Sequence, residues 1–344
     1  MKKVSLFLAI CLLIGLLTGC AGTPVVYYTN CTCPTGSHDV EVAAPAETQV
    51  PVAVEGAVKT GLAVVANISI TDPTEEAEGK ASYDVTFAAV TVDDNGVIIA
   101  CKFDSLGEDI AFDASGVITT ADVELRTKYE KQFDYNMVNY GVSTMEWFQQ
   151  ADALAEYAIG KTVEELRNGA VDETDHAVDA DLATAATIKL GGYVDAIELA
   201  VQNAKHLGAQ AGDELILTTV NTLTNGNVTS DVVALTMQEG VITSCCLDSL
   251  QAELAVSEEG VVTVGNTLTK NQKGFDYNMV NSGVSTMEWF QQAEGFAAYV
   301  TGKTPAEVAG IAVNEEFHPT EADLTASCTI AIDNFQALIA KASK

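Results

Sequence analysis

Two threonine hydroxyls stand at positions where they could carry chemistry. Thr187 closes the segment DLATAAT at residues 181–187, and Thr329 closes the related segment DLTASCT at 323–329. An apolar pattern over 186–204 predicts a long helix that begins near Thr187. A threonine at the beginning of a helix can act as its N-cap. A phosphate group at the same place would be stabilised by the free backbone N–H groups and the helix dipole.

A second set of candidate residues lies in a segment that occurs twice. Residues 133–150 return at 275–292 with one change, Tyr140 to Ser282, whereas the rest of the two copies has diverged much further. Because cores accept apolar substitutions of similar volume, a polar and aromatic segment that resisted change is more typical of a binding surface. A strained Asn-Tyr-Gly turn that the fold requires, or recent gene conversion, is the alternative. The candidate binding residues are Tyr135, Asn136, Ser143, Thr144 and Trp147 in the first copy and Tyr277, Asn278, Ser285, Thr286 and Trp289 in the second.

The remaining candidates for catalysis are few. His176 and His318 each have carboxylates nearby, but their loops lack the glycine-spaced pattern of a calcium site, so we expect no metal. The sequence contains no G-x-S-x-G, H-E-x-x-H, Walker or G-x-G-x-x-G motif. Nothing in it therefore supports a hydrolase or a nucleotide-dependent enzyme.

The segment 181–187 resembles the D-x-x-[S/T]-G-A-[T/S] element of the FMN-binding domain family. That family occurs in flavin subunits of membrane-bound redox complexes and in flavinylated extracellular lipoproteins, where a flavin transferase joins FMN through its phosphate to the final Thr or Ser. The resemblance implies that Thr187 is the acceptor and that Asp181 and Thr184 are flanking determinants. Ala185 departs from the usual glycine.

The second copy of the motif departs further from the family. Thr329 aligns with the acceptor and Asp323 with the flanking aspartate, but residues 326–328 read Ala-Ser-Cys. The order of elements agrees with the family over most of each repeat, although only a handful of residues match. We therefore expect flavin on Thr187 and, by alignment with it, on Thr329.

The resemblance implies a function in electron transfer. It predicts a lipid-anchored flavoprotein that relays electrons from a membrane redox donor to an external acceptor, an electron carrier more than a turnover enzyme. Its partners would be the flavin transferase, the membrane redox donor and, through the lipid, the membrane. The residues leave an alternative open, a non-catalytic surface lipoprotein that binds a ligand or partner through the duplicated Tyr/Asn/Trp segment.

The elements that must position these residues are predicted twice along the chain. In each copy the first half alternates with a period of two and the second half with a period of 3.6. Apolar runs at 83–92 and 97–103 flank the turn sequence DDNG, which predicts a β-hairpin. The spacing over 146–159 predicts a helix. We expect an α+β fold of two tandem homologous domains, each a mainly antiparallel sheet with helices packed on one face.

The length of the chain limits the number of domains, and its net charge limits the kinds of partner it can bind. The chain has 344 residues, of which 48% are apolar, enough for about two domains with packed cores. We place the repeats at 59–206 and 207–344. The formal net charge of −31 should repel nucleic acids and anionic lipid headgroups, so no nucleic acid partner is expected.

The N-terminus predicts the location of the protein. A positive start and the apolar run 4–17 are typical of a signal peptide. Residues 17–20, Leu-Thr-Gly-Cys, resemble the lipobox of bacterial lipoproteins, with a plain secretory signal as the alternative. We expect residues 1–19 to be removed, Cys20 to carry lipid and 20–58 to form a tether. The protein would then sit on the extracytoplasmic face of the bacterial cell membrane.

The other cysteines of the mature chain suit two interpretations. Small buried apolar residues are the first, and up to three disulfides are the second. They are Cys31, Cys33, Cys101, Cys245, Cys246 and Cys328.

Overall fold

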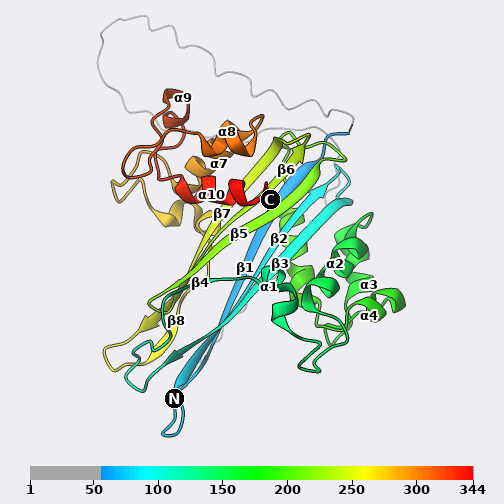
Figure 1. Cartoon of the computed structure of the whole chain (residues 1–344), viewed down its shortest axis with the longest axis vertical. Helices are drawn as coiled ribbons and strands as arrows, with labels where there is room; N and C mark the ends of the chain where they lie inside the picture. The colour runs from blue at the N-terminus through cyan, green and yellow to red at the C-terminus, as the bar shows by residue number, and fades with distance from the viewer. Residues whose placement is uncertain (1–55, 344) are drawn as a thin grey trace, which may run out of the picture. The chain divides into compact units, whose positions relative to one another are not determined.

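The structure, a computed structural model, describes residues 56–343 (Figure 1). The expected signal peptide, the lipid-bearing Cys20, Cys31, Cys33 and nearly all of the expected tether lie outside the described residues. All described residues belong to one compact unit.

The first sheet is a three-stranded antiparallel meander from repeat 1. Its strands β1 (Lys59–Thr71), β2 (Gly79–Val92) and β3 (Ile98–Phe112) lie in the order β1-β2-β3. The turn between β2 and β3 forms because Asp93 Oδ1 accepts the N–H groups of Asn95 and Val97, both at 2.8 Å. This hairpin confirms the one predicted from the sequence.

The second sheet has five strands, of which four come from repeat 2. Strands β5 (Glu214–Thr224), β6 (Asn227–Gln238), β7 (Val241–Val256) and β8 (Val262–Asn266) form an antiparallel meander. The fifth strand, β4 (Val123–Leu125), belongs to repeat 1 but pairs with β5 at the edge. Repeat 1 therefore completes the sheet of repeat 2.

The helices follow the strands in each repeat. Those of repeat 1 are α1 (Lys128–Lys131), η1 (Gln132–Tyr135), α2 (Trp147–Ala158), α3 (Val163–Ala170), α4 (Ala180–Ala185) and α5 (Gly191–Asn203). Their counterparts in repeat 2 are α6 (Lys270–Lys273), η2 (Gly274–Tyr277), α7 (Trp289–Val300), α8 (Pro305–Ala309), α9 (Ala322–Thr325) and α10 (Asp333–Lys341).

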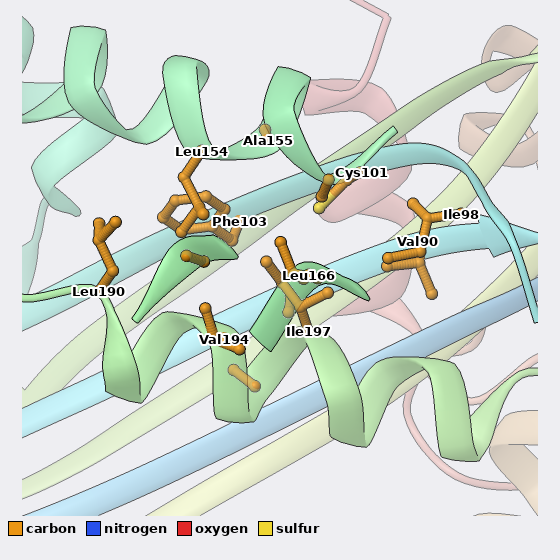
Figure 2. Packing of buried hydrophobic residues seen from close by; sticks show 14 of the residues in the cluster. Val90, Ile98, Cys101, Phe103, Leu154, Ala155, Leu166, Leu190, Val194 and Ile197 are labelled. Carbon is orange, nitrogen blue, oxygen red and sulfur yellow. The ribbon is translucent and has the colours of Figure 1, made fainter. Parts of the chain in front are cut away.

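Each sheet buries one face under its own helices. In repeat 1, Val90 and Phe103 from the sheet pack against Leu154 of α2 and Ile197 of α5 (Figure 2). In repeat 2, Leu235 and Leu247 pack with Phe296 and Leu338 in the corresponding cluster. The prediction of an α+β fold, with helices on one face of a mainly antiparallel sheet, is confirmed.

A third core joins the two repeats. Phe87 and Leu106 of the first sheet and Val232 and Leu250 of the second belong to one buried cluster. The layers therefore run helices, sheet, sheet, helices, and β2 is apolar on both faces along its second half. The described cysteines are free thiols, and Cys101, Cys245 and Cys328 pack in the two helix-covered cores.

One helix prediction is wrong in its extent. The pattern over 186–204 predicts a continuous helix, but α5 begins only at Gly191 and residues 186–190 form an irregular segment after α4. The N–H groups of Thr187 and Ile188 are bound by the side chain of Gln150, and Leu190 N–H donates to Asp175 O at 2.6 Å. These donors are therefore not available for helical bonds. Among the described residues, no helix has both the length and the apolar character needed to cross a membrane.

Candidate functional site

The threonine motif and the duplicated segment meet at a buried glutamine. Gln150 of α2 is fully buried, and its Oε1 accepts from Thr187 N at 2.7 Å, Thr187 Oγ1 at 3.2 Å and Ile188 N at 3.2 Å. Its Nε2 donates to Ser143 Oγ at 3.1 Å and Met145 O at 3.0 Å. Ser143 Oγ also lies 3.2 Å from Thr187 Oγ1. Thr187 itself is exposed, so its hydroxyl is held at the surface in a defined place.

Repeat 2 repeats this geometry. Gln292 is fully buried, and its Oε1 accepts from Thr329 N and Thr329 Oγ1, both at 2.9 Å. Its Nε2 donates to Ser285 Oγ and Met287 O, both at 3.1 Å. Two motifs 37 residues apart in each copy are thus joined by the same hydrogen bonds.

The duplicated segment is also held together by hydrogen bonds between its own residues. Glu146 is buried and accepts the N–H groups of Met137 at 2.8 Å and Val138 at 3.2 Å, while Gln149 accepts the N–H of Glu146. Asn136 adopts a left-handed conformation, with φ of 69°. The same bonds hold Glu288 in repeat 2. Several residues that are identical in the two copies therefore have a role in the fold of the segment itself.

The two tryptophans lie mainly in the cores. Trp147 is 2% exposed and packs edge-on against Phe103 and Tyr193. Its Nε1 donates to the Tyr193 hydroxyl at 3.0 Å. Trp289 is 5% exposed and packs against Phe335. In neither repeat does the ring offer an open face on the surface.

A cavity of about 380 Å³ lies beside Trp289 in repeat 2. Tyr277 and Trp289 of the duplicated segment line it, together with Ile330, which follows Thr329. Lys270 lines it as well, and its ammonium lies 5.1 Å from the Trp289 ring and 5.5 Å from the Tyr277 ring. Burial lowers the pKa of Lys270. The cavity thus brings together a cationic group, aromatic rings and hydroxyls, a combination typical of small-ligand sites.

A larger cleft of about 850 Å³ lies between the repeats. It is lined by Thr60 of β1 and Asn203 of α5 on one side and by Cys246 of β7 and Glu294 of α7 on the other. None of the site residues predicted from the sequence lines it. Its walls mix apolar and polar groups.

Two aspartates, one in each repeat, have raised carboxyl pKa values. Asp104 and Asp248 occupy matching places in β3 and β7, and each accepts N–H groups from the following residue and from the first turn of α1 or α6. Burial raises the pKa of both carboxyls to about 6 although these donors oppose the shift. Both groups therefore titrate close to the neutral range.

The other predicted residues lie apart from these networks or at their edge. Asp181 is exposed in the first turn of α4, and Thr184 Oγ1 donates to Ala180 O within the same helix. Asp323 is exposed at the corresponding place in α9. Thr144, Thr286 and Asn278 are exposed and Tyr135 is partly buried. Within residues 56–343 no group of three or more His, Cys, Asp or Glu residues is placed to hold a metal ion.

Sequence reasoning missed two pairs of residues that organise the sites. Gln150 and Gln292 lie inside the duplicated segment, so its identity was a signal that could have found them. Lys128 and Lys270 precede the two copies by the same five residues. No protein-family model matches the chain, and neither a curated protein nor a solved structure does.

Proposed function

We propose that this chain is a lipid-anchored extracytoplasmic flavoprotein that carries FMN on Thr187 and relays electrons from a membrane donor to an external acceptor. One observation carries the proposal. In both repeats an exposed threonine hydroxyl is held by a buried glutamine at the end of the motif that resembles a flavin attachment site.

The residues around Thr187 fit a phosphate-linked group. Its hydroxyl is accessible, and Ala185 and Ala186 before it are small. The buried Trp147 offers no face to a flavin ring, but Tyr140 and Val142 are 76% and 70% exposed in the loop that carries Ser143. When bound, FMN would supply one- or two-electron transfer. Gln150 and Ser143 would orient the attachment oxygen.

The test is production of the protein with a flavin transferase present. Visible flavin absorbance that survives denaturation, and an added FMN mass on the intact chain, are the expected results. Thr187→Val should abolish flavin in repeat 1, whereas Thr329→Val should remove less or none. Thr263→Val is the matched control, because Thr263 is exposed in β8, outside the motif, and its hydroxyl donates to Ala255 O. A colourless wild-type protein, or equal colour in the Thr187→Val variant, would contradict the proposal.

The alternative, a non-catalytic ligand-binding lipoprotein, is favoured by one separate observation. The cavity in repeat 2 is lined by Tyr277 and Trp289 of the duplicated segment. A protein that binds small molecules there needs no flavin. The two functions are distinguished by colour and by ligand binding to the unmodified chain.

A further inference from the structure

The two repeats share a set of polar groups around the tryptophan but differ in the hydrogen-bond and charge partners of these groups. Lys128, Ser105 and Trp147 of repeat 1 correspond to Lys270, Ser249 and Trp289 of repeat 2. Two positions differ between the repeats. Asp84, opposite Gly107 in the first sheet, is replaced by Thr229, opposite Gln251 in the second, and Tyr193 of α5 is replaced by Phe335 of α10.

In repeat 1 the chain satisfies these groups itself. Asp84 Oδ1 accepts from Ser105 Oγ at 3.3 Å and lies 3.9 Å from Lys128 Nζ. The hydroxyl of Tyr193 accepts from Trp147 Nε1 at 3.0 Å. A carboxylate and a hydroxyl from the protein thus neutralise one ammonium and bind two further donors.

In repeat 2 neither partner is present. Ser249 is 1% exposed, yet its Oγ has no hydrogen-bond partner. Within the described part of the chain, Lys270 forms no ion pair within 4.0 Å, although the charges of Asp231 and Asp248 favour its ammonium form. Trp289 has no counterpart of the Tyr193 hydroxyl, because Phe335 stands at that position. A buried donor without a partner carries a penalty of about 1–3 kcal/mol, so such groups call for an acceptor.

The cavity of about 380 Å³ lies where these partners are missing. Its lining includes all three donor residues and both replaced positions, Thr229 and Phe335. We propose that this cavity binds a small organic carboxylate with an apolar or aromatic body. The ligand's carboxylate takes the place that the Asp84 side chain holds in repeat 1. This site does not depend on flavin, because none of its groups is the Thr329 hydroxyl.

One cationic and two acidic side chains line the cavity, so an anionic ligand would need direct contact with the Lys270 ammonium. Lys270 is the cation that lines it, whereas Asp231 and Asp333 also line it. Asp231 is 7% exposed and is bound by Asn334 Nδ2 at 2.8 Å. A phosphate dianion would meet more repulsion from these carboxylates than a carboxylate monoanion would, since repulsion between like charges grows with the charge. The apolar body of the ligand would contact Met279, Ile330 and Phe335, which also line the cavity.

Binding can be measured on the chain without residues 1–19, carrying Cys20→Ser and made without a flavin transferase. The probes are benzoate, phenylacetate and 3-phenylpropionate, with phenylacetamide and inorganic phosphate as controls. The chain has two tryptophans, so its two indole N–H resonances report on the two repeats separately. We expect saturable calorimetric binding of at least one carboxylate, with a shift of the Trp289 indole resonance and not of the Trp147 resonance.

The repeats supply matched variants for the same experiment. Lys270→Met should weaken binding by about tenfold or more, because the charge-assisted contact is lost. The double variant Thr229→Asp and Phe335→Tyr installs the partners of repeat 1 and should abolish binding while retaining the fold, as judged by circular dichroism. Asp84→Thr with Tyr193→Phe should open a second site and shift the Trp147 resonance.

Three outcomes would overturn the proposal. The first is no saturable binding by any of the carboxylates up to about 10 mM, a limit that corresponds to negligible affinity. The second is equal binding of phenylacetamide or phosphate. The third is unchanged binding in the folded Thr229→Asp and Phe335→Tyr variant. Colour in the flavin experiment is unaffected by any of these results, so the two proposals fail separately.

Discussion

Gln150 and Gln292 place both ends of their amide groups inside the protein. Each links the last threonine of the motif to the serine three residues before the N-cap of its own helix. A glutamine can do this because its amide is both donor and acceptor. At the residue scale, these two side chains position the candidate attachment site.

Gln150→Leu should therefore destabilise the protein strongly. The change leaves the N–H groups of Thr187 and Ile188 without their acceptor, and we expect a loss of about 3 kcal/mol in the free energy of unfolding. Urea denaturation measures it. Gln202→Ala, which removes an exposed amide bound to Glu198 at 3.1 Å, is the control and should change stability by less than about 0.5 kcal/mol. Equal effects of the two changes would refute the role assigned to Gln150.

The raised pKa of Asp248 should make the stability of the protein depend on pH. Burial raises the pKa of its carboxyl from 3.8 to about 6, so the folded protein holds this proton over a range where the unfolded chain has lost it. The free energy of unfolding therefore decreases as the pH rises from about 4 to about 6, and the loss persists above that range. Asp248→Asn removes the effect and should gain stability over wild type, on the order of 2–3 kcal/mol, as the pH is raised to about 7.

Denaturation curves at several pH values test this expectation. Exposed Asp276→Asn is the control for removing one negative charge from this acidic chain. A difference between Asp248→Asn and wild type that does not change with pH would show that the carboxyl is not protonated in the folded state.

At the element scale, α5 begins with two glycines in different surroundings. A Cβ on Gly192 would meet nothing within 4 Å, whereas a Cβ on Gly191 would clash with the Asp175 side chain. Gly192→Ala should therefore stabilise the protein by about 0.5–1 kcal/mol through helix propensity. Gly191→Ala should destabilise it, since Asp175 also accepts the N–H of Leu190. Thermal unfolding of the two variants should shift in opposite directions, and a shared sign would count against this account of the helix start.

The elements also show where sequence reasoning works. Period-two runs and the Asp-Asn-Gly turn identify β2 and β3 because their signals are local. The start of α5 could not be predicted, because the donors of Thr187 and Ile188 are taken by Gln150, far away in the sequence. Thr187 and the duplicated segment were both singled out from the sequence, but their contact could not be predicted, because it depends on the same distant side chain. Ser249 could not be singled out from the sequence, because only the structure shows that its buried hydroxyl has no hydrogen-bond partner.

At the scale of the whole molecule, the repeats depend on each other. The core between the sheets draws Phe87 and Leu106 from one repeat and Val232 and Leu250 from the other, and β4 pairs with β5 of the second repeat. The sequence did not predict the contact between the two sheets. An apolar sheet face can be covered by helices or by a second sheet, and the alternating pattern is the same in both cases.

A fragment of residues 56–206 should therefore not be a stable monomer. Its inner sheet face would expose an apolar surface that normally contacts repeat 2, and such patches drive association. We expect the fragment to aggregate or self-associate, and to form a soluble 1:1 complex when refolded with residues 207–344. Size-exclusion chromatography with light scattering measures both states. A monomeric fragment that unfolds cooperatively would contradict this dependence.

The buried free cysteines allow the opening of each helix-covered core to be measured by its rate of alkylation. Burial raises the pKa of Cys101 to about 12 and that of Cys328 to about 11, so the reactive thiolate is scarce at neutral pH. Each sulfur can be alkylated only when the core around it opens. The rate at Cys101 then reports the opening of repeat 1 and the rate at Cys328 that of repeat 2. The wild-type chain therefore contains the probes needed to determine whether the two repeats open together or independently.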